Sequence, residues 1–207
     1  MMNIGGIPFS TLLSFLATAL VIELTPGPNM TYLALVSATD GRRAGFMTVA
    51  GVTLGLAIIG AIAAFGVAEA IQASDILYGL LRWAGVLFLL YLAWDGWKSS
   101  AVTTATEAEG RYFARGLITN LLNPKAGMFY IAVLPTFIVP QLPPVPQAMT
   151  LTAIYVCIGA IVHATIVMLA GTLEPVLNDP RRETLVRRVL SVLLALVALW
   201  FAWSTAP

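Results

Sequence analysis

The chain has 207 residues, of which 59% are hydrophobic and 10% are charged, and its formal net charge is +1. Soluble domains average about 45–50% apolar and about 25% charged residues, so this composition excludes an ordinary soluble protein and indicates an integral membrane protein. The near-zero net charge gives no reason to expect a nucleic-acid partner. With Cys157 and His163 as the single cysteine and histidine, we expect neither a metal ion nor another cofactor.

Six apolar segments follow one another along the chain. A helix that crosses the lipid bilayer needs about 20 apolar residues, and most of the six are near or above that length. The first segment is read as a retained span and not a cleaved signal peptide, because no Lys or Arg precedes it. We therefore predict an all-α membrane protein with six transmembrane helices in a single domain, residues 1–207. The segments are Ile7–Leu24 continuing through Met30–Thr39, Ala44–Ala68, Ile76–Trp97, Phe113–Val139, Ala148–Thr172 and Val189–Trp203.

The basic residues divide unevenly between the two sides that alternating spans define. At most Arg82 falls on one side, Lys125 falls within the fourth segment, and the other nine of the 11 Lys and Arg residues fall on the opposite side. Loops that face the cytoplasm carry an excess of Lys and Arg, so that side is predicted to be cytoplasmic and both termini to be outside. The nine residues are Arg42, Arg43, Lys98, Arg111, Arg115, Arg181, Arg182, Arg187 and Arg188.

Three spans on each side of a polar linker give the two halves opposite orientations. The halves are residues 1–98 and 111–207, and the linker, residues 99–110, is expected in the cytoplasm. Two halves of opposite orientation predict two inverted three-helix repeats, a common plan among transporters. The feature that matches best between them is a proline break in the first helix of each half.

The first break is Thr25-Pro26-Gly27-Pro28-Asn29, and the second is Asn123-Pro124. Proline removes a backbone donor and disfavours helical geometry at the preceding residue, so neither helix is expected to be continuous. Pro28 lies 15 residues before Arg43, roughly 22 Å along a helix, and Asn123 lies 12 residues after Arg111, roughly 18 Å. Both breaks are therefore predicted at similar depth near the middle of the bilayer.

Each break starts a new helix whose first amide groups lack helical acceptors. Those amides and the positive end of the helix dipole favour a carboxylate, and paired broken helices at mid-depth indicate a transporter binding site. A plain proline kink is the structural alternative. The predicted substrate-binding residues are Glu23, Thr25, Pro26, Gly27, Pro28, Asn29, Asn120, Asn123, Pro124 and Lys125.

Ionisable residues at depth are costly and are functional candidates by default. Glu23 is expected to bind a substrate ammonium or to carry a coupled proton, unless it only bonds to loose backbone. Lys125 is expected to hold a substrate carboxylate, to neutralise Glu23 or Asp95, or to reach toward the lipid headgroups. Asp95 and His163 are the other candidates for proton coupling. The structural alternatives are an Asp95–Lys98 ion pair and a neutral His163 bonded to a backbone carbonyl.

The second span contains the small-residue pattern Gly51-x-x-x-Gly55. This pattern lets two helices approach closely in a membrane, and it joins helices within one chain more often than between chains. It favours a contact inside this chain, with a homodimer as the alternative.

Several motifs together resemble the LysE/RhtB amino-acid exporters. Thr25–Asn29 followed by Gly41-Arg42-Arg43-Ala44-Gly45 is similar to the opening signature of that family. The stretch from Gly85 through Tyr91-Leu92 to Gly96 is similar to its third span. Asn123–Ala126 followed by Leu134-Pro135 is similar to the start of its second half. Thr136-Phe137 stands where the family often has Gln and an aromatic residue, a difference that bears on the preference for a substrate side chain.

The resemblance implies a bacterial inner-membrane protein that exports amino acids or close derivatives by antiport with protons. One carboxylate near the breaks favours a neutral substrate, of the threonine, homoserine or leucine type, over lysine or arginine. An exporter of a cation or other metabolite and a non-transporting membrane subunit are the alternatives. An enzyme is not expected, because no paired nucleophile and base is present, and no ATP-binding loop is found, so an ion gradient must drive transport.

Overall fold

The computed structural model describes residues 3–4, 7–66, 75–98, 105–172 and 180–204. Expectations for residues 99–104 of the linker, for the end of the second segment at Ala68 and for the last residues of both termini lie outside these ranges. Within them the chain forms eight α-helices, α1 Phe9–Leu24, α2 Pro28–Thr39, α3 Gly41–Ala64, α5 Asp75–Lys98, α6 Ala105–Leu121, α7 Pro124–Met128, α8 Pro144–Ala170 and α9 Pro180–Ser204.

The all-α prediction is confirmed apart from a small hairpin before the first helix. Strands β1 (Asn3–Ile4) and β2 (Ile7–Pro8) pair antiparallel, so the helix that was expected from Ile7 begins at Phe9. Helix α6 begins at Ala105, inside the stretch expected to be the linker. Its first turns contain Ala and Glu, which are good helix formers, whereas the hydropathy pattern shows only the apolar part of a helix.

Both predicted breaks interrupt a helix. Thr25 and Gly27, the residues before the two prolines of the first break, are extended, and the axes of α1 and α2 differ by 58°. At the second break Asn123 is extended, and the helical segments on its two sides differ by 49°. After α7 the chain continues as a π-helical turn, Phe129–Val133, and a 3₁₀ turn, Leu134–Phe137. The irregular backbone is therefore concentrated in the first span of each predicted half.

Two described helices, α3 and α8, are each long and apolar enough to cross a membrane. The bent pairs α1–α2 and α6–α7 meet the same criterion when each pair is taken as one span, which gives up to four spans in the described residues. The chain is therefore a multi-pass membrane protein, and the number of six spans stays a prediction.

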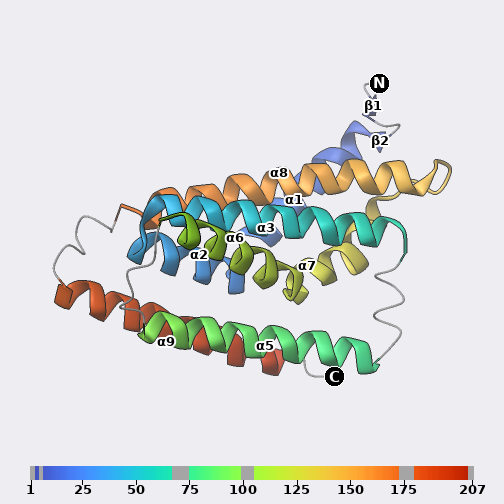
Figure 1. The fold of residues 1–207 in the computed structure, drawn as a ribbon. Helices are drawn as coiled ribbons and strands as arrows, with labels where there is room; N and C mark the ends of the chain where they lie inside the picture. Colours follow the sequence, from blue (N-terminus) through green and yellow to red (C-terminus); the bar gives the residue numbers. More distant parts are fainter. Residues whose placement is uncertain (1–2, 5–6, 67–74, 99–104, 173–179, 205–207) are drawn as a thin grey trace.

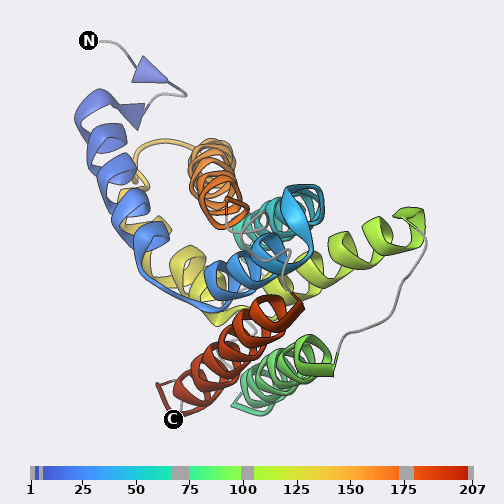
Figure 2. The same cartoon turned by 90° about the vertical axis from the view of Figure 1, so that its left-hand side faces the viewer.

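The helices form two groups that meet along α2. Helices α3, α6 and α8 lie side by side with α2 beneath them, while α5 and α9 run as a separate pair (Figure 1). The end-on view shows α9 between α5 and α2, and shows α1 leaning away from the group from its junction with α2 (Figure 2). Of the first broken span, α2 therefore lies between the two groups, whereas α1 extends away from them.

Glycines explain why α3 and α6 pack so closely. A Cβ atom on Gly51 would lie 2.0 Å from the backbone oxygen of Phe113, and one on Gly116 would lie 2.3 Å from that of Thr48. A Cβ on Gly55 would lie 2.9 Å from the Asn120 side chain. The Gly51-x-x-x-Gly55 pattern is therefore used within the chain, where it brings α6 and Asn120 against α3.

Candidate functional site

The two helix breaks lie against each other and exchange polar contacts. Asn29, at the start of α2, donates its side-chain Nδ2–H to Asn120 Oδ1 on α6 at 2.8 Å. Lys125, directly after the second break, donates from Nζ to the backbone oxygen of Thr25 at 2.7 Å. That carbonyl is one that α1 leaves without a helical donor when it ends. Each broken span thus satisfies polar groups of the other in an otherwise apolar protein.

The Asn29–Asn120 pair leaves unused hydrogen-bonding capacity in the protein interior. Both side chains are at least 94% buried, and Asn29 Oδ1 and Asn120 Nδ2 have no partner among the described residues. Turning both amides over would exchange the two roles but would still leave one free acceptor and one free donor. The pair can therefore bind a polar ligand with a donor and an acceptor at the same time.

Beside this junction Glu23 faces α8. It is 4% exposed, and its Oε2 lies 3.5 Å from Nε2 of His163, which is 2% exposed. Tyr155, Gly159 and His163 follow at intervals of four residues, so they share one face of α8. A Cβ atom on Gly159 would lie 2.8 Å from Leu56 Cδ1, so the glycine lets α8 approach the Leu56 side chain of α3 beside Glu23. The partner of His163 is thus Glu23, and its Nδ1 has none in the described chain.

These groups surround one internal cavity. Seven of the predicted site residues line it, together with Met30, Leu56, Ala126 and Tyr155, which sequence reasoning missed. Its free volume is about 10 Å³, which is room for about one water molecule. In the sequence Tyr155 resembles an ordinary core aromatic residue. The only signal for its place at the cavity is its four-residue spacing to Gly159 and His163, which puts the three on one face of a helix. The seven are Glu23, Gly27, Asn29, Asn120, Asn123, Lys125 and His163.

The two new helix starts are not equivalent. At α7 the Asn123 side chain accepts the Lys125 backbone N–H at 3.0 Å, so an amide that was expected to be free is capped. At α2 the N-terminal cap is Gly27, which has no side chain, and Pro28 has no N–H. The amides of Asn29 and Met30 therefore remain as the first donors of α2. The α2 start is the better place for a carboxylate.

Five of the twelve predicted residues do not line the cavity, namely Thr25, Pro26, Pro28, Pro124 and Asp95. Pro28 and Pro124 are the first residues of α2 and α7. The Thr25 side chain is exposed and donates to Val21 O at 2.9 Å, which closes the last turn of α1, and Pro26 is also exposed. Asp95 does not pair with Lys98. Its Oδ2 instead accepts from Arg115 Nη1 at 2.6 Å, while the Lys98 ammonium lies over the Trp94 ring. The predicted Asp95–Lys98 pair, which rested on closeness in sequence, is wrong because α5 directs Asp95 toward α6.

A wall of aromatic rings closes the cavity toward the end where α8 begins. Phe129 and Tyr155 stack with ring centroids 3.6 Å apart, and the Tyr130 hydroxyl donates to Leu56 O at 3.0 Å. Beyond Tyr130 lies a second cavity of about 420 Å³, lined mainly by apolar residues such as Ala63 and Leu134. Phe129 and Tyr130 belong to the π-helical turn, a form often found at functional sites.

The part of the chain that the structure describes contains no group of three or more His, Cys, Asp or Glu side chains that could hold a metal ion. The charged groups at the cavity are one carboxylate, Glu23, and one ammonium, Lys125, with His163 beside them. This set can hold a small molecule that carries a positive and a negative group, and can exchange a proton with Glu23 or His163.

Comparison with known proteins gives a family and named relatives. The model of the family "LysE type translocator" matches residues 20–205. A homoserine/homoserine lactone efflux protein of Salmonella typhi is 27% identical over 189 residues, which span 89% of this chain and 92% of that protein. A leucine efflux protein of Salmonella choleraesuis is 35% identical over 131 residues, which span 60% of this chain and 62% of that protein. No solved structure matches the chain.

The Asn29–Asn120 contact predicts a measurable coupling between the two broken spans. Replacing either residue by Ala leaves the other buried amide unpaired, which costs about 1–3 kcal/mol of stability. Replacing both is expected to cost less than the sum of the two, with a coupling of about 1 kcal/mol in a double-mutant cycle of unfolding in detergent. The Asn29→Ala and Thr150→Ala pair is the control and should be additive, because Thr150 bonds only within α8. Additive effects for Asn29 and Asn120 would contradict the contact.

Proposed function

The chain belongs to the LysE type translocator family, and we propose that it exports neutral amino acids or close derivatives from the bacterial cytoplasm. The observation that carries this proposal is that one carboxylate, Glu23, and one ammonium, Lys125, line the same cavity between two broken helices. A neutral amino acid carries one ammonium and one carboxylate, and the cavity offers one partner for each. The relatives named as homoserine and leucine efflux proteins support the same substrate class.

In the proposed complex Glu23 binds the substrate ammonium. The substrate carboxylate lies at the start of α2, within reach of the backbone amides of Asn29 and Met30 and of the Lys125 ammonium. Lys125 then exchanges its bond to Thr25 O for the substrate, and the free donor and acceptor of Asn29 and Asn120 complete the polar contacts. The present cavity is too small for an amino acid, so binding requires the halves to move apart.

We also propose six spans arranged as two inverted three-helix repeats. Helices α5 and α9 have 24 and 25 residues, and a helix of that length is about 36 Å long, enough to cross a bilayer core of about 30 Å. An inverted repeat matches the broken spans with each other, α3 with α8 and α5 with α9. The contacts of α3 with α8 and of α5 with α9 are those that a two-fold axis between the halves would produce.

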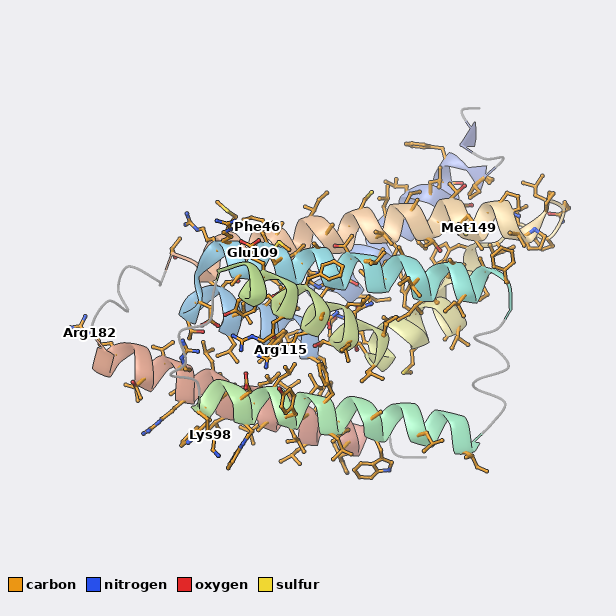
Figure 3. All side chains as sticks on the ribbon, in the orientation of Figure 1. Phe46, Lys98, Glu109, Arg115, Met149 and Arg182 are labelled. Atoms are coloured by element: carbon orange, nitrogen blue, oxygen red, sulfur yellow. The ribbon has the colours of Figure 1, made fainter. Side chains whose placement is uncertain are left out.

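The proposed orientation places the linker end of the molecule in the cytoplasm. Figure 3 shows Lys98, Glu109 and Arg182 toward one end and Met149 toward the other. The basic residues at the first end make it the cytoplasmic one. Large exposed apolar residues such as Leu87 on α5 and Leu20 on α1 suit contact with lipid between the two ends. The lipid bilayer is therefore the proposed environment of these faces.

Glu23 gives the first test of export. Bacteria that express the protein are loaded with dipeptides, and excretion of each amino acid is measured. We expect the unaltered protein to excrete neutral amino acids faster than cells with an empty vector, and Glu23→Gln to lose at least about 90% of that excess, because the ammonium loses its charged partner. Glu109→Gln is the matched control, since Glu109 pairs with Arg43 at the surface, and it should retain export.

Two outcomes would contradict these assignments separately. Excretion no faster than from vector cells, with the protein present in the membrane, would reject amino-acid export. Undiminished export by Glu23→Gln would leave export intact and remove Glu23 from the site. A faster excretion of lysine or arginine than of neutral amino acids would reject the proposed substrate class.

Proton coupling is proposed to pass through the Glu23–His163 pair. In inverted membrane vesicles with an acidic interior, addition of substrate should dissipate the pH gradient, as read from a pH-sensitive fluorescent dye. We expect His163→Gln to abolish this signal while it still exchanges labelled for unlabelled substrate, because exchange requires no net proton movement. Leu169→Gln on the exposed face of α8 is the control. A full proton signal from His163→Gln would exclude this histidine from coupling.

Fusions at the C-terminus test the orientation. Alkaline phosphatase is active only outside the cytoplasm, and green fluorescent protein exported in an unfolded state does not fluoresce there. We expect the phosphatase fusion to be active and the fluorescent fusion to be dark. A fusion placed in the linker after Glu107 should give the opposite pattern. The reverse result at either site would contradict the six-span orientation.

A further inference from the structure

Another small polar cavity, the arginine cavity, lies between α2, α5, α6 and α9. It offers about 20 Å³ to the centre of a water molecule, and Tyr32, Asp95 and Arg115 are among its lining residues. Figure 3 shows Arg115 on the side of α6 that faces α5. The same two helices line both polar cavities, because Asn29 and Asn120 of the first are followed by Tyr32 on α2 and preceded by Arg115 on α6.

The arginine cavity lies on the proposed cytoplasmic side of the Glu23 cavity. Tyr32 is three residues beyond Asn29 in the direction of Asp40, and Arg115 is five residues before Asn120 in the direction of the linker. At about 1.5 Å per residue these steps are about 5 and about 8 Å. A substrate that approaches the first cavity from the cytoplasm between α2 and α6 therefore passes Arg115.

Two ion pairs close this region. Arg115 Nη1 donates to Asp95 Oδ2 at 2.6 Å and joins α6 to α5, and Arg187 Nη2 donates to Asp40 Oδ1 at 3.1 Å and joins α9 to the α2–α3 junction. Arg115 Nη2 also donates to the Tyr91 hydroxyl at 3.1 Å. Since α5 and α6 otherwise touch little, Arg115 supplies the main polar connection between them.

The cavity retains unused polar groups. The Tyr32 hydroxyl, on a side chain 2% exposed, makes no hydrogen bond of acceptable geometry in the described chain, and Arg111 Nε is buried and also without one. Three arginines, Arg111, Arg115 and Arg187, meet two aspartates, Asp40 and Asp95. Among the described residues that line this cavity, guanidinium groups outnumber carboxylates by one, which favours an additional carboxylate as a ligand.

The Asp95 carboxylate binds the Arg115 guanidinium in the way that a substrate carboxylate would. A guanidinium presents its donors in a fixed fork that matches any carboxylate, and Arg115 is largely buried, with a side chain 13% exposed. Separating the pair without replacement would leave a buried charge unpaired, which is costly. A carboxylate that takes the place of Asp95 avoids that cost and at the same time releases α5 from α6.

We propose that Arg115 is a cytoplasmic binding site for the substrate carboxylate, distinct from the Glu23 cavity, and that Asp95 keeps this site closed until a substrate carboxylate replaces it. This inference rests on the proposed export function and orientation. The substrate class is any small molecule with a free carboxylate, and the adjacent Arg111 and Tyr32 supply further donors. From Arg115 the carboxylate moves about one and a half helical turns to the start of α2.

The test measures the KM for uptake of radiolabelled leucine and homoserine by inverted membrane vesicles, in which the cytoplasmic face is outward. Removing the two partners of one ion pair should have opposite effects. Arg115→Gln removes the binding group and is expected to raise KM at least about ten-fold, as for loss of a charge-assisted hydrogen bond. Asp95→Asn removes the competing carboxylate and is expected to lower KM by about three-fold or more. Arg115→Lys, which keeps the charge and loses the fork, should fall between Arg115→Gln and the unaltered protein.

These readouts separate a binding role from a structural one. KM does not depend on the amount of folded protein, so poor folding of a variant does not produce the expected pattern. Arg43→Gln is the matched control, because Arg43 forms an exposed pair with Glu109 on α6 and lies outside both cavities. Its KM should be unchanged.

A purely structural ion pair would move KM in the same direction for Arg115→Gln and Asp95→Asn, or would change neither, and either result would overturn the proposal. If the unaltered protein transports no amino acid, including leucine and homoserine, the export function itself is overturned and this inference with it. Transport by the unaltered protein with unaltered KM in Arg115→Gln would overturn only the second site.

Discussion

Backbone groups that leave a helix inside a membrane must find partners within the protein, and this constraint determines the arrangement around the two proline breaks. The α1 and α6 helices end next to prolines, and polar groups freed at the two breaks are satisfied across the junction between them. Lys125 bonds to the Thr25 carbonyl, and Asn29 bonds to Asn120. The contacts that repair the breaks are also the polar groups that surround the cavity. Under the proposed function, a substrate that enters this cavity replaces some of the contacts that join the two breaks.

Close helix packing allows these groups to meet. Gly51 and Gly116 bring α3 and α6 into backbone contact, and Gly55 leaves room for Asn120 to point into the cavity. Gly159 likewise leaves room for Leu56, another residue that lines the cavity. In a membrane, where lipid competes with apolar side chains, small residues are an effective way to bring two helices together. The glycines thus serve the site by determining the distance between helices, although Gly27 alone among the glycines lines the cavity.

Charged side chains line two of the cavities. Glu23, Lys125 and His163 lie at the broken helices, and a cluster of arginines and aspartates lies between them and the linker end. On the opposite side the aromatic wall of Phe129, Tyr130 and Tyr155 separates the cavity from a wider apolar one. The central polar cavity thus lies between the arginine cluster and the apolar cavity.

The sequence by itself determined the membrane class, the helical segments and the positions of both breaks. These features follow from local chemistry, since apolar length sets a span and proline ends a helix wherever it occurs. The family motifs, and Glu23, Lys125 and His163 as candidates, were equally readable along the chain.

Only the tertiary structure decided which groups meet. The Glu23–His163 and Asp95–Arg115 pairs join residues 140 and 20 positions apart, and nothing in the local sequence selects those partners over Lys98 or a backbone carbonyl. Tyr155 became a cavity residue only when α8 turned that face toward α1. The capping of the Lys125 amide by Asn123 likewise depended on how the backbone turns at the break. Pairing inside a membrane is a matter of helix rotation and approach, which hydropathy does not encode.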